Sequence, residues 1–255
     1  MTELVRMSKT ASGRVAVIEL DRPPVNALSV ALWEAIEATF AHVADDADVA
    51  CAVLTAVGRK TFCGGADVHE FLELTRETRI VRQQTVSRVL GVVDNFPLPI
   101  IAAINGATVG GGITLASTCD IRLAASHAHF SLPEIKRGAA GGGGAFVRRL
   151  SMPEGLLRLM LYTGRRFTAH DMSRMHFIDE VLPYEELLTT ALSIAEEIAS
   201  NDRESLVLMK RAVLDAELVS GNWMEAYRTT ATATANMTAL DASREGIRDF
   251  LADKD

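Results

Sequence analysis

Residues 98–120 read LPIIAAINGATVGGGITLASTCD. The first eight form a continuous apolar run that ends in an Asn-Gly turn signal, which is typical of a strand buried on both faces of a sheet. Three glycines at 110–112 then open an apolar segment that we predict to be a helix. A buried strand, a glycine-rich turn and a helix in this order indicate an α/β core.

Two further apolar runs, RVAVIEL at 14–20 and VACAVLTAV at 49–57, are also predicted to be buried strands. Between them we predict a helix over 29–44 with Ser29 as its N-cap. Its apolar residues recur at spacings of four and three and share one face: Leu32, Ile36, Phe40 and Val43. Strands therefore alternate with helices in this half of the chain.

The pattern changes after about Thr163. Four helical patterns follow, with DEVLP as one plausible strand before them; they cover 184–201, 203–218, 222–237 and 241–254. We therefore predict an α/β body over residues 1–195 and a helical C-terminal region over 196–255.

Composition restricts the function classes. The chain has 255 residues, 48% of them hydrophobic, and a formal net charge of −7, which argues against a general nucleic-acid binder. Three cysteines without CxxC spacing indicate reduced thiols and a cytoplasmic protein. The N-terminus lacks the apolar core of a secretory signal, and the longest apolar run is interrupted by glycines, so no membrane span is expected.

Two glycine-rich turns follow predicted strands. In KTFCGGADVHEF, residues 60–71, Gly64 and Gly65 precede Ala66, whose N–H we expect to point outward from the start of a helix. The glycines at 110–112 repeat this arrangement. Two such N–H groups that converge would form an oxyanion hole, although each pattern alone is more often a tight turn or a close helix–strand contact. Glu134 is a candidate general acid or base, or else a solvated surface residue.

Several ordered motifs resemble the crotonase family, the enoyl-CoA hydratase/isomerase superfamily. They run from about residue 13 to the C-terminus: DRPPVNALS, FCGGADVHEF, PIIAAINGATVGGGITLASTCDIRLA, FSLPEIKRG, YTGRRFTAHD and SREGIRDFLADK. The resemblance implies a spiral of ββα units with a helical C-terminal trimerisation region, and a homotrimer or homohexamer. It also implies an enzyme that binds acyl-CoA thioesters and stabilises a thioester enolate.

The resemblance implies roles for particular residues. The N–H groups of Ala66 and Gly111 would bind the thioester oxygen, and Glu134 would move the proton. Coenzyme A would run along backbone near Val25 and Ala27, with residues 66–68 (Ala66, Asp67 and Val68) around its adenine. It would be part of the substrate, and neither a metal nor another cofactor is implied.

Two departures from the family pattern bear on the reaction. Hydratases of the family use a second glutamate, but that position here is Thr114, and a hydroxyl cannot act as a carboxylate base near neutral pH. The single glutamate therefore favours Δ3-Δ2 isomerisation of an enoyl-CoA. The alternatives are an enoyl-CoA hydratase of the fatty-acid β-oxidation type and a non-catalytic acyl-CoA binding protein. The glycine-rich segment 138–146 is the second departure and is expected to shape the acyl pocket.

Other polar residues receive structural interpretations. His69 and His129 could replace the missing glutamate, but we expect the first to be exposed and the second to pack at a strand end. Asp67 is expected to cap the helix after Ala66, and Asp120 to cap a turn. Two basic residues near the C-terminus, Arg248 and Lys254, could meet CoA phosphate in a neighbouring subunit or lie on a solvated helix face.

Overall fold

The structure is a computed structural model, and it describes residues 4–70, 75–137 and 152–218. Its strands form two sheets. The larger sheet has the order β1-β2-β3-β5-β7-β10, and its strands are Val5–Lys9 (β1), Val15–Leu20 (β2), Cys51–Ala56 (β3), Ile100–Ile104 (β5), Ile121–Ala125 (β7) and Glu180–Leu182 (β10). The smaller sheet has the order β4-β6-β8-β9, and its strands are Thr61–Cys63 (β4), Ala107–Val109 (β6), His129–Ser131 (β8) and Phe167–Thr168 (β9).

From β3 to β8, successive strands alternate between the two sheets. β3, β5 and β7 pair in parallel in the larger sheet, and each is followed by a short strand, β4, β6 or β8, that pairs in parallel in the smaller sheet. Only the edge pairs β1–β2 and β8–β9 are antiparallel among the described strands. The chain therefore winds as a spiral of ββα units.

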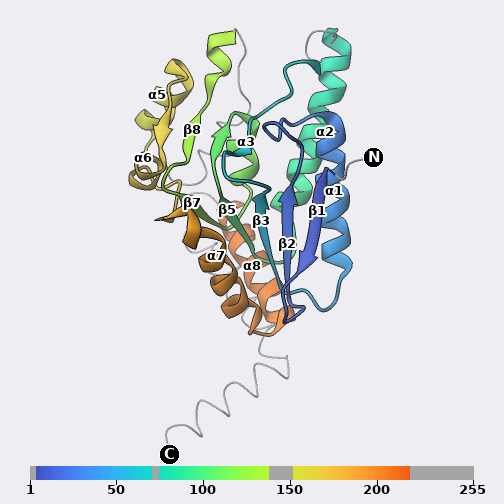
Figure 1. Ribbon diagram of the computed structural model, residues 1–255. Helices are drawn as coiled ribbons and strands as arrows, with labels where there is room; N and C mark the ends of the chain where they lie inside the picture. The colour runs from blue at the N-terminus through green and yellow to red at the C-terminus, as the bar shows by residue number, and fades with distance from the viewer. Residues whose placement is uncertain (1–3, 71–74, 138–151, 219–255) are drawn as a thin grey trace, which may run out of the picture.

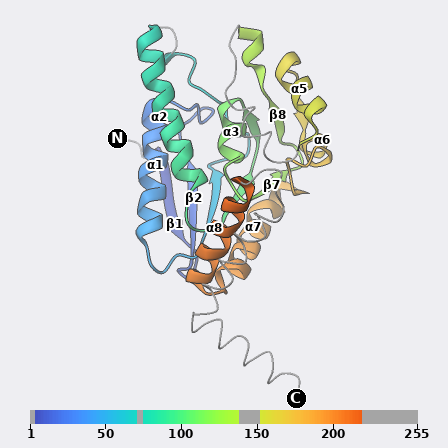
Figure 2. The same ribbon diagram turned by 180° about the vertical axis from the view of Figure 1, so that it is seen from behind.

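The helices lie around these sheets (Figures 1 and 2). They are Val30–Asp45 (α1), Arg76–Asp94 (α2), Gly111–Ala116 (α3), Glu154–Thr163 (α5), Ala169–Arg174 (α6), Tyr184–Ala199 (α7) and Arg203–Leu218 (α8), with a 3-10 helix at Pro133–Arg137. In Figure 1, α3 lies toward the top of the molecule, and α7 and α8 lie toward the bottom.

The larger sheet is covered on both faces. Every residue of β3 and β5 is buried, as the continuous apolar runs predicted. Leu54 belongs to the cluster packed against α1 and α2, whereas Val53, on the opposite face of the same strand, belongs to the cluster packed against α7. Phe40 of α1 meets Phe96 edge-to-face with ring centroids 5.1 Å apart. This packing makes a rigid body from which the turns project.

The long predicted elements are confirmed. The strands over 14–20, 49–57 and 98–105 correspond to β2, β3 and β5, and the helix over 29–44 corresponds to α1. The Ser29 side chain accepts the Leu32 N–H at this helix's start. Later, DEVLP contains β10, while α7 and α8 match two of the four helical patterns.

The predicted division into two regions remains a prediction. Residue 195 falls inside α7, which runs from Tyr184 to Ala199, and the helical patterns at 222–237 and 241–254 lie outside the described residues. The same holds for Arg248 and Lys254. Trimer or hexamer formation also stays a prediction.

Candidate active site

Two glycine turns meet because neither carries a side chain at the point of contact. A β-carbon at Gly65 would lie only 2.6 Å from the carbonyl oxygen of Val109, the last residue of β6. Gly65 also has φ +84°, a conformation that other residues rarely adopt. The turn after β4 and the turn after β6 are therefore held in backbone contact, and only glycine permits it.

Glu134 reaches the same place from the 3-10 helix that follows β8. A β-carbon at Gly110 would lie 2.6 Å from the Glu134 Oε1 atom, so the carboxylate rests directly on this glycine. The Gly110 N–H donates to the Ser131 carbonyl at 2.9 Å, which ties the turn to β8. Glu134 is half-buried, and its Oε2 atom is shielded from solvent. The carboxylate is thus next to the glycine turns and is not a solvated surface group.

The N–H groups of Ala66 and Gly111 lie near each other. A β-carbon on Gly111 would be 3.9 Å from the Ala66 nitrogen. Ala66 pairs with Leu28 in a single parallel bridge, in which the neighbours of Ala66 make the hydrogen bonds: Gly65 accepts from Leu28 at 2.7 Å and Asp67 donates to Leu28 at 3.2 Å. Within the described part of the chain, neither the Ala66 nor the Gly111 N–H donates to a backbone carbonyl. Such a pair of donors can bind one oxygen atom.

Ala66 was expected to open a helix directly; instead, within the described residues a turn at 68–69 follows it and Glu70 has 3-10 geometry, while residues 71–74 lie outside the described residues. Ala66 sits in the bridge to Leu28 and a turn follows it, while α2 begins only at Arg76. The Asp67 side chain does cap the segment that follows: its Oδ1 atom accepts the His69 N–H at 3.1 Å within the turn, while its role at a helix stays a prediction. The donor at Ala66 is therefore positioned by a β-bridge and not by a helix start.

Asp67 is buried, with 7% of its surface exposed, and is paired with Arg22. Its Oδ2 atom accepts the Arg22 Nη2 group at 2.7 Å. Burial alone would raise the pKa of Asp67, but the hydrogen bonds from Arg22 and from the His69 N–H outweigh burial and lower the pKa below its ordinary value. Asp67 is therefore a carboxylate at neutral pH, and its side chain is occupied within the protein.

The turn at Val25–Ala27 borders the first glycine turn. The Gly64 N–H donates to the Val25 carbonyl at 2.8 Å, and a β-carbon at Gly64 would lie 2.9 Å from the same oxygen. Asn26 has φ +51° and its side-chain amide donates to the Phe62 carbonyl at 3.1 Å, so it fastens the turn to β4. The side chains of Val25 and Val68 are each 42% exposed. The two segments expected to meet CoA thus lie beside the glycine turn with exposed apolar side chains.

Thr114 is buried in the first turns of α3, and its N–H donates to the Gly110 carbonyl at 3.3 Å. Thr114, the position at which hydratases of the family carry a second carboxylate, is thus hydrogen-bonded to Gly110, the glycine that Glu134 contacts. The segment 138–146 lies outside the described residues.

The histidines occupy the structural positions expected of them. His69 is exposed in the turn after Asp67. His129 is half-buried at the start of β8, where it pairs with Thr168; burial lowers its pKa, and the charge of Arg166 lowers it further. His127 precedes the strand and its Nε2 atom lies 2.8 Å from the Arg59 carbonyl. Among the described residues, no group of three or more His, Cys, Asp or Glu side chains could hold a metal ion.

Three buried free thiols, Cys51, Cys63 and Cys119, are unreactive groups. Burial raises the pKa of each to about 12, so each remains protonated at neutral pH. Cys63 lies directly before the glycine turn, and a β-carbon at Gly112 would be 3.0 Å from its sulfur atom. Its role here is packing.

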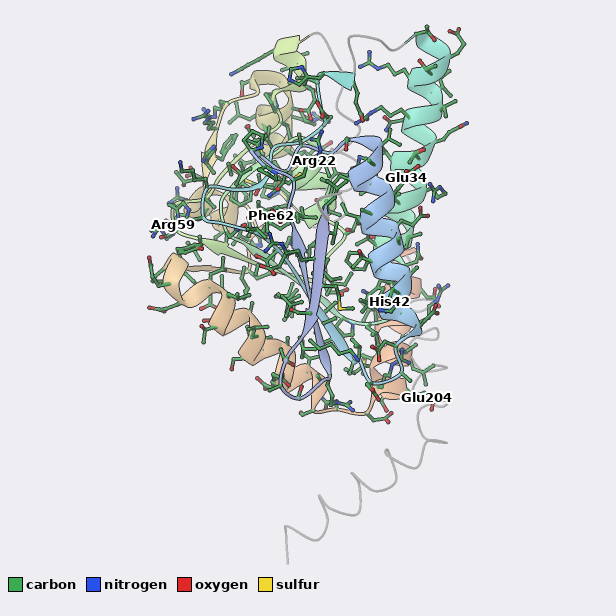
Figure 3. The ribbon with its side chains drawn as sticks, turned by 45° about the vertical axis from the view of Figure 1, so that its right-hand side comes forward. Arg22, Glu34, His42, Arg59, Phe62 and Glu204 are labelled. Atoms are coloured by element: carbon green, nitrogen blue, oxygen red, sulfur yellow. The ribbon has the colours of Figure 1, made fainter. Side chains whose placement is uncertain are left out.

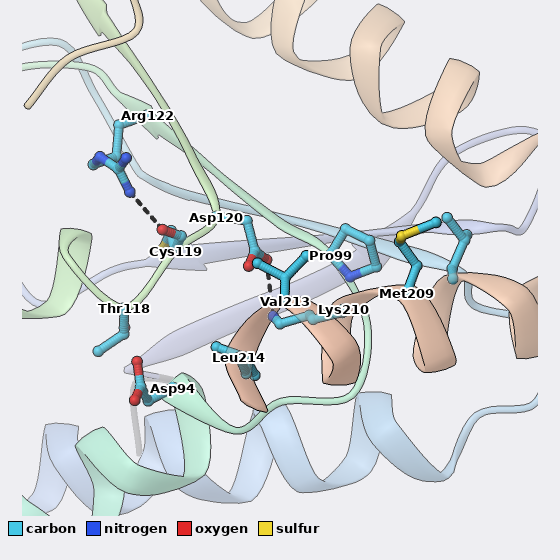
Figure 4. Close-up of a pocket in the computed structure, with 11 residues that line it drawn as sticks. Asp94, Pro99, Thr118, Cys119, Asp120, Arg122, Met209, Lys210, Val213 and Leu214 are labelled. Carbon is cyan, nitrogen blue, oxygen red and sulfur yellow. Dashed lines mark hydrogen bonds and ion pairs between the residues drawn. The ribbon is translucent and has the colours of Figure 1, made fainter. Parts of the chain in front are cut away.

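A cavity of about 290 Å³ lies at the other end of α3 and β5 (Figure 4). Its charged side chains are joined within the protein. Lys210 of α8 donates to Asp120 at 2.8 Å and to the Leu98 carbonyl at 2.9 Å, and Asp120 accepts the Ile100 N–H at 2.7 Å. Asp120 therefore has the structural role that was predicted, although it connects two strands and α8 and does more than cap a turn.

Sequence reasoning missed the ion pairs around Ala66. Arg22 and Arg82 both approach the Leu28–Ala66 bridge, near the start of α1 (Arg22 is labelled in Figure 3). The two prolines after Arg22 restrict its backbone but say nothing of where its charge points. Its partner Asp67 lies 45 positions away, so no local pattern could identify the pair.

Comparisons with known proteins agree in naming one family. The family profile described as enoyl-CoA hydratase/isomerase matches residues 10–255. The short-chain-enoyl-CoA hydratase of Clostridium acetobutylicum is 33% identical over 218 residues, which cover 83% of this chain and 82% of that protein. The crotonyl-CoA hydratase of Syntrophomonas wolfei is 31% identical over 241 residues, 93% of this chain and 92% of that one.

Solved structures agree with the sequence relatives. The crystal structure of an enoyl-CoA hydratase from Bacillus anthracis superposes with a TM-score of 0.91 and 29% identity, and it covers 98% of this chain and 96% of its own. In the described parts of our chain, none of the helices combines the length and the apolar character needed to cross a membrane. The expected fold is therefore confirmed, and the chain belongs to the enoyl-CoA hydratase/isomerase family, the crotonases, and is an enzyme of that family.

Proposed function

We propose that this enzyme converts an acyl-CoA thioester through an enolate whose oxygen is bound by the N–H groups of Ala66 and Gly111. The observation that carries the proposal is the proximity of these two donors, with 3.9 Å between the Ala66 nitrogen and a β-carbon position on Gly111. Two N–H groups directed at a developing oxyanion stabilise it more than they stabilise the neutral carbonyl, so they lower the barrier to enolate formation.

Glu134 is proposed to move the proton. In a 3-enoyl thioester its carboxylate would remove a proton from C2, and the electrons of that C–H bond would delocalise onto the thioester oxygen. The proton would then be delivered to C4 while the double bond moves to C2–C3, so one residue serves as base and then as acid. The contact of Glu134 Oε1 with Gly110, the neighbour of Gly111, supports this role.

Thr114 supports isomerisation over hydration. Hydration requires that one group activates water for attack at C3 and that a proton reaches C2, and two carboxylates divide this work. A threonine hydroxyl in place of the second carboxylate does not ionise near neutral pH and cannot serve as that base. Isomerisation needs one carboxylate, so Δ3-Δ2 enoyl-CoA isomerisation is the proposed reaction.

CoA is proposed to bind as part of the substrate along Val25, Ala27 and residues 66–68. The exposed side chains of Val25 and Val68 and the backbone contact between Val25 and Gly64 support this path, because they border the turn that carries Ala66. With the thioester carbonyl at Ala66, the CoA chain would leave the site over these residues.

Hydration remains the second candidate, since the relatives named above are hydratases. The third candidate is a non-catalytic protein that binds acyl-CoA, and Thr114 is again the feature that motivates it. The three candidates differ in their products, so one set of substrates separates them.

The test is incubation of the purified protein with 3-hexenoyl-CoA and, separately, with 2-hexenoyl-CoA, followed by conjugated-thioester absorbance and product mass. We expect the 3-enoyl ester to give an isomer of unchanged mass and the 2-enoyl ester to gain little water. Rapid addition of water to the 2-enoyl ester would refute the single-carboxylate proposal. Binding without conversion of either ester would favour the non-catalytic candidate.

A substitution at Thr114 sharpens the choice between isomerase and hydratase. The variant Thr114→Glu restores a carboxylate in α3, near the glycine that Glu134 contacts, and we expect it to raise hydration of 2-hexenoyl-CoA by roughly 10- to 100-fold. Thr114→Gln is the matched control, because it has the same size and cannot act as a base. Equal hydration by both variants would show that position 114 does not limit water addition.

A further inference from the structure

Ala66 is held in place by very little regular structure. β4 ends at Cys63, and Ala66 makes only a one-residue bridge to Leu28. Of the two backbone hydrogen bonds in this bridge, that from Asp67 to Leu28 is long, at 3.2 Å. A donor that must point at one oxygen atom needs more support than this, because a catalytic group that is displaced by 1 Å loses much of its effect.

Two ion pairs supply that support, one on each side of the bridge. Arg22 donates through Nη1 to the Ala27 carbonyl at 2.8 Å and through Nη2 to Asp67 Oδ2 at 2.7 Å. One planar guanidinium therefore joins the residue before Leu28 to the residue after Ala66. The other Asp67 oxygen accepts the His69 N–H, so the carboxylate also sets the turn that follows.

The second pair reaches the bridge from α2. Arg82 donates through Nη2 to the Leu28 carbonyl at 2.8 Å and through Nε to Glu70 Oε2 at 2.9 Å. Glu70 in turn accepts the Val30 N–H at the start of α1, at 2.9 Å. This pair fixes Leu28, the bridge partner of Ala66, against two helices.

We propose that Arg22 and Asp67 are positioning residues for the reaction, which orient the Ala66 N–H through the Leu28–Ala66 bridge and do not touch the reacting atoms. The inference rests on the proposed function, because it assigns these residues to a donor of that site. The side chain of Asp67 would then hold the segment 66–68 in place, whereas CoA would contact the backbone of that segment.

Burial and geometry distinguish this pair from an ordinary surface ion pair. Asp67 is only 7% exposed, so water competes little for its oxygens, and Arg22 spans two backbone segments with separate nitrogen atoms. A lysine at position 22 would keep the charge but could not make both contacts in the same plane. The orientation of Ala66 therefore depends on the shape of the guanidinium as well as on its charge.

The test measures how strongly the bound thioester carbonyl is polarised. Butyryl-CoA labelled with ¹³C at the carbonyl carbon is short and has no double bond to react, so its infrared carbonyl stretch reports the hydrogen bonds at its oxygen. We expect the wild-type protein to shift this band to lower frequency. We expect Asp67→Asn to bind the ester within about 3-fold of wild type but to show a smaller shift, with kcat reduced roughly 10- to 100-fold and KM little changed.

Asp120→Asn is the control, since it alters the ion pair between the partly exposed Asp120 and the buried Lys210 at the other end of β5. It should lower thermal stability and leave the carbonyl band where the wild type has it. If Asp67→Asn fails to fold, Arg22→Lys carries the test, with a band shift between those of the wild type and the free ester.

The outcomes separate the two proposals. A wild-type protein that binds butyryl-CoA with no shift of the band would refute the donor role of Ala66 and Gly111, and with it the proposed function. A shifted wild-type band that is unchanged in Asp67→Asn, or in Arg22→Lys where that variant carries the test, would refute only the positioning role. Weaker binding with an unchanged shift would also refute it, since Asp67 would then be a binding residue.

Discussion

The two ends of β5 are joined to the rest of the molecule by different means. At the carboxyl end, glycines allow backbone to touch backbone, and Gly65 meets Val109 where no side chain would fit. At the amino end, side-chain charges make the connections, and Asp120 holds both the Ile100 N–H and Lys210. The glycine end leaves N–H groups beside a carboxylate, whereas the charged end pairs its polar groups with one another. We therefore expect substitutions at the first end to change chemistry and those at the second to change stability.

The largest effect is expected for Glu134→Gln. The amide keeps the size of the side chain but cannot take a proton, so turnover should fall by roughly 10²- to 10⁴-fold. Isothermal titration with butyryl-CoA should show binding close to that of the wild type, because the proposed donors and CoA contacts are unchanged. Turnover within a few-fold of wild type would exclude Glu134 as the proton carrier and would assign the chemistry to another group.

The next effect is expected for Gly65→Ala. Its β-carbon would lie 2.6 Å from the Val109 carbonyl, and its φ of +84° is strained for alanine, so the two turns must separate. We expect kcat to fall roughly 10²- to 10³-fold, as for loss of one oxyanion donor. The strain should also reduce the free energy of unfolding by about 1–3 kcal/mol.

Gly91→Ala provides the matched control for this substitution. Gly91 lies within α2 and nothing is within 4 Å of its β-carbon position. The same change should therefore stabilise the protein by up to about 1 kcal/mol through helix propensity, without a change in kcat. If urea unfolding and kcat respond alike in the two variants, the glycine contact at residue 65 has no special function.

The sequence predicted the long elements well because their signals are local. Continuous apolar runs identified β3 and β5, and a spacing of three and four residues identified α1. The strands of the smaller sheet have only two or three residues, which is too short for a periodic signal. For that reason the turn after β4 was interpreted as a helix start, when Ala66 in fact belongs to a bridge with Leu28.

The candidate site was predictable in part, because glycine-rich turns and a glutamate can be recognised in the sequence as candidate catalytic elements. The motifs pointed to Ala66, Gly111 and Glu134, and the structure brings their segments together through Gly65 and Gly110. The charges that hold this arrangement were not predictable. Arg22 and Asp67 become neighbours only when the spiral closes, and neither residue differs locally from a solvated surface charge.

At the charged end, Asp120→Asn should act on stability alone. Lys210 is buried, and loss of the charge on its partner would leave its ammonium group poorly compensated. We expect the free energy of unfolding to fall by about 1.5–3 kcal/mol, with part of the cost relieved because Asp120 is partly exposed. Urea unfolding and kcat should be measured together. A loss of kcat larger than 3-fold, with the protein folded, would contradict the division between the two ends of β5.

The smallest effect is a pH dependence of stability from Asp67, one of the charged residues at the glycine end. Its pKa is lowered in the folded protein from an ordinary value of 3.8, so folding favours the ionised carboxylate. Its contribution to stability is therefore complete above about pH 4 and is lost as the pH falls from that ordinary value through the folded pKa. Wild type and Asp67→Asn should differ in urea unfolding at pH 6, and this difference should shrink near pH 3. An equal difference at both pH values would mean that the cost of the substitution does not depend on ionisation of Asp67, and the ion pair with Arg22 would then contribute orientation without net stability.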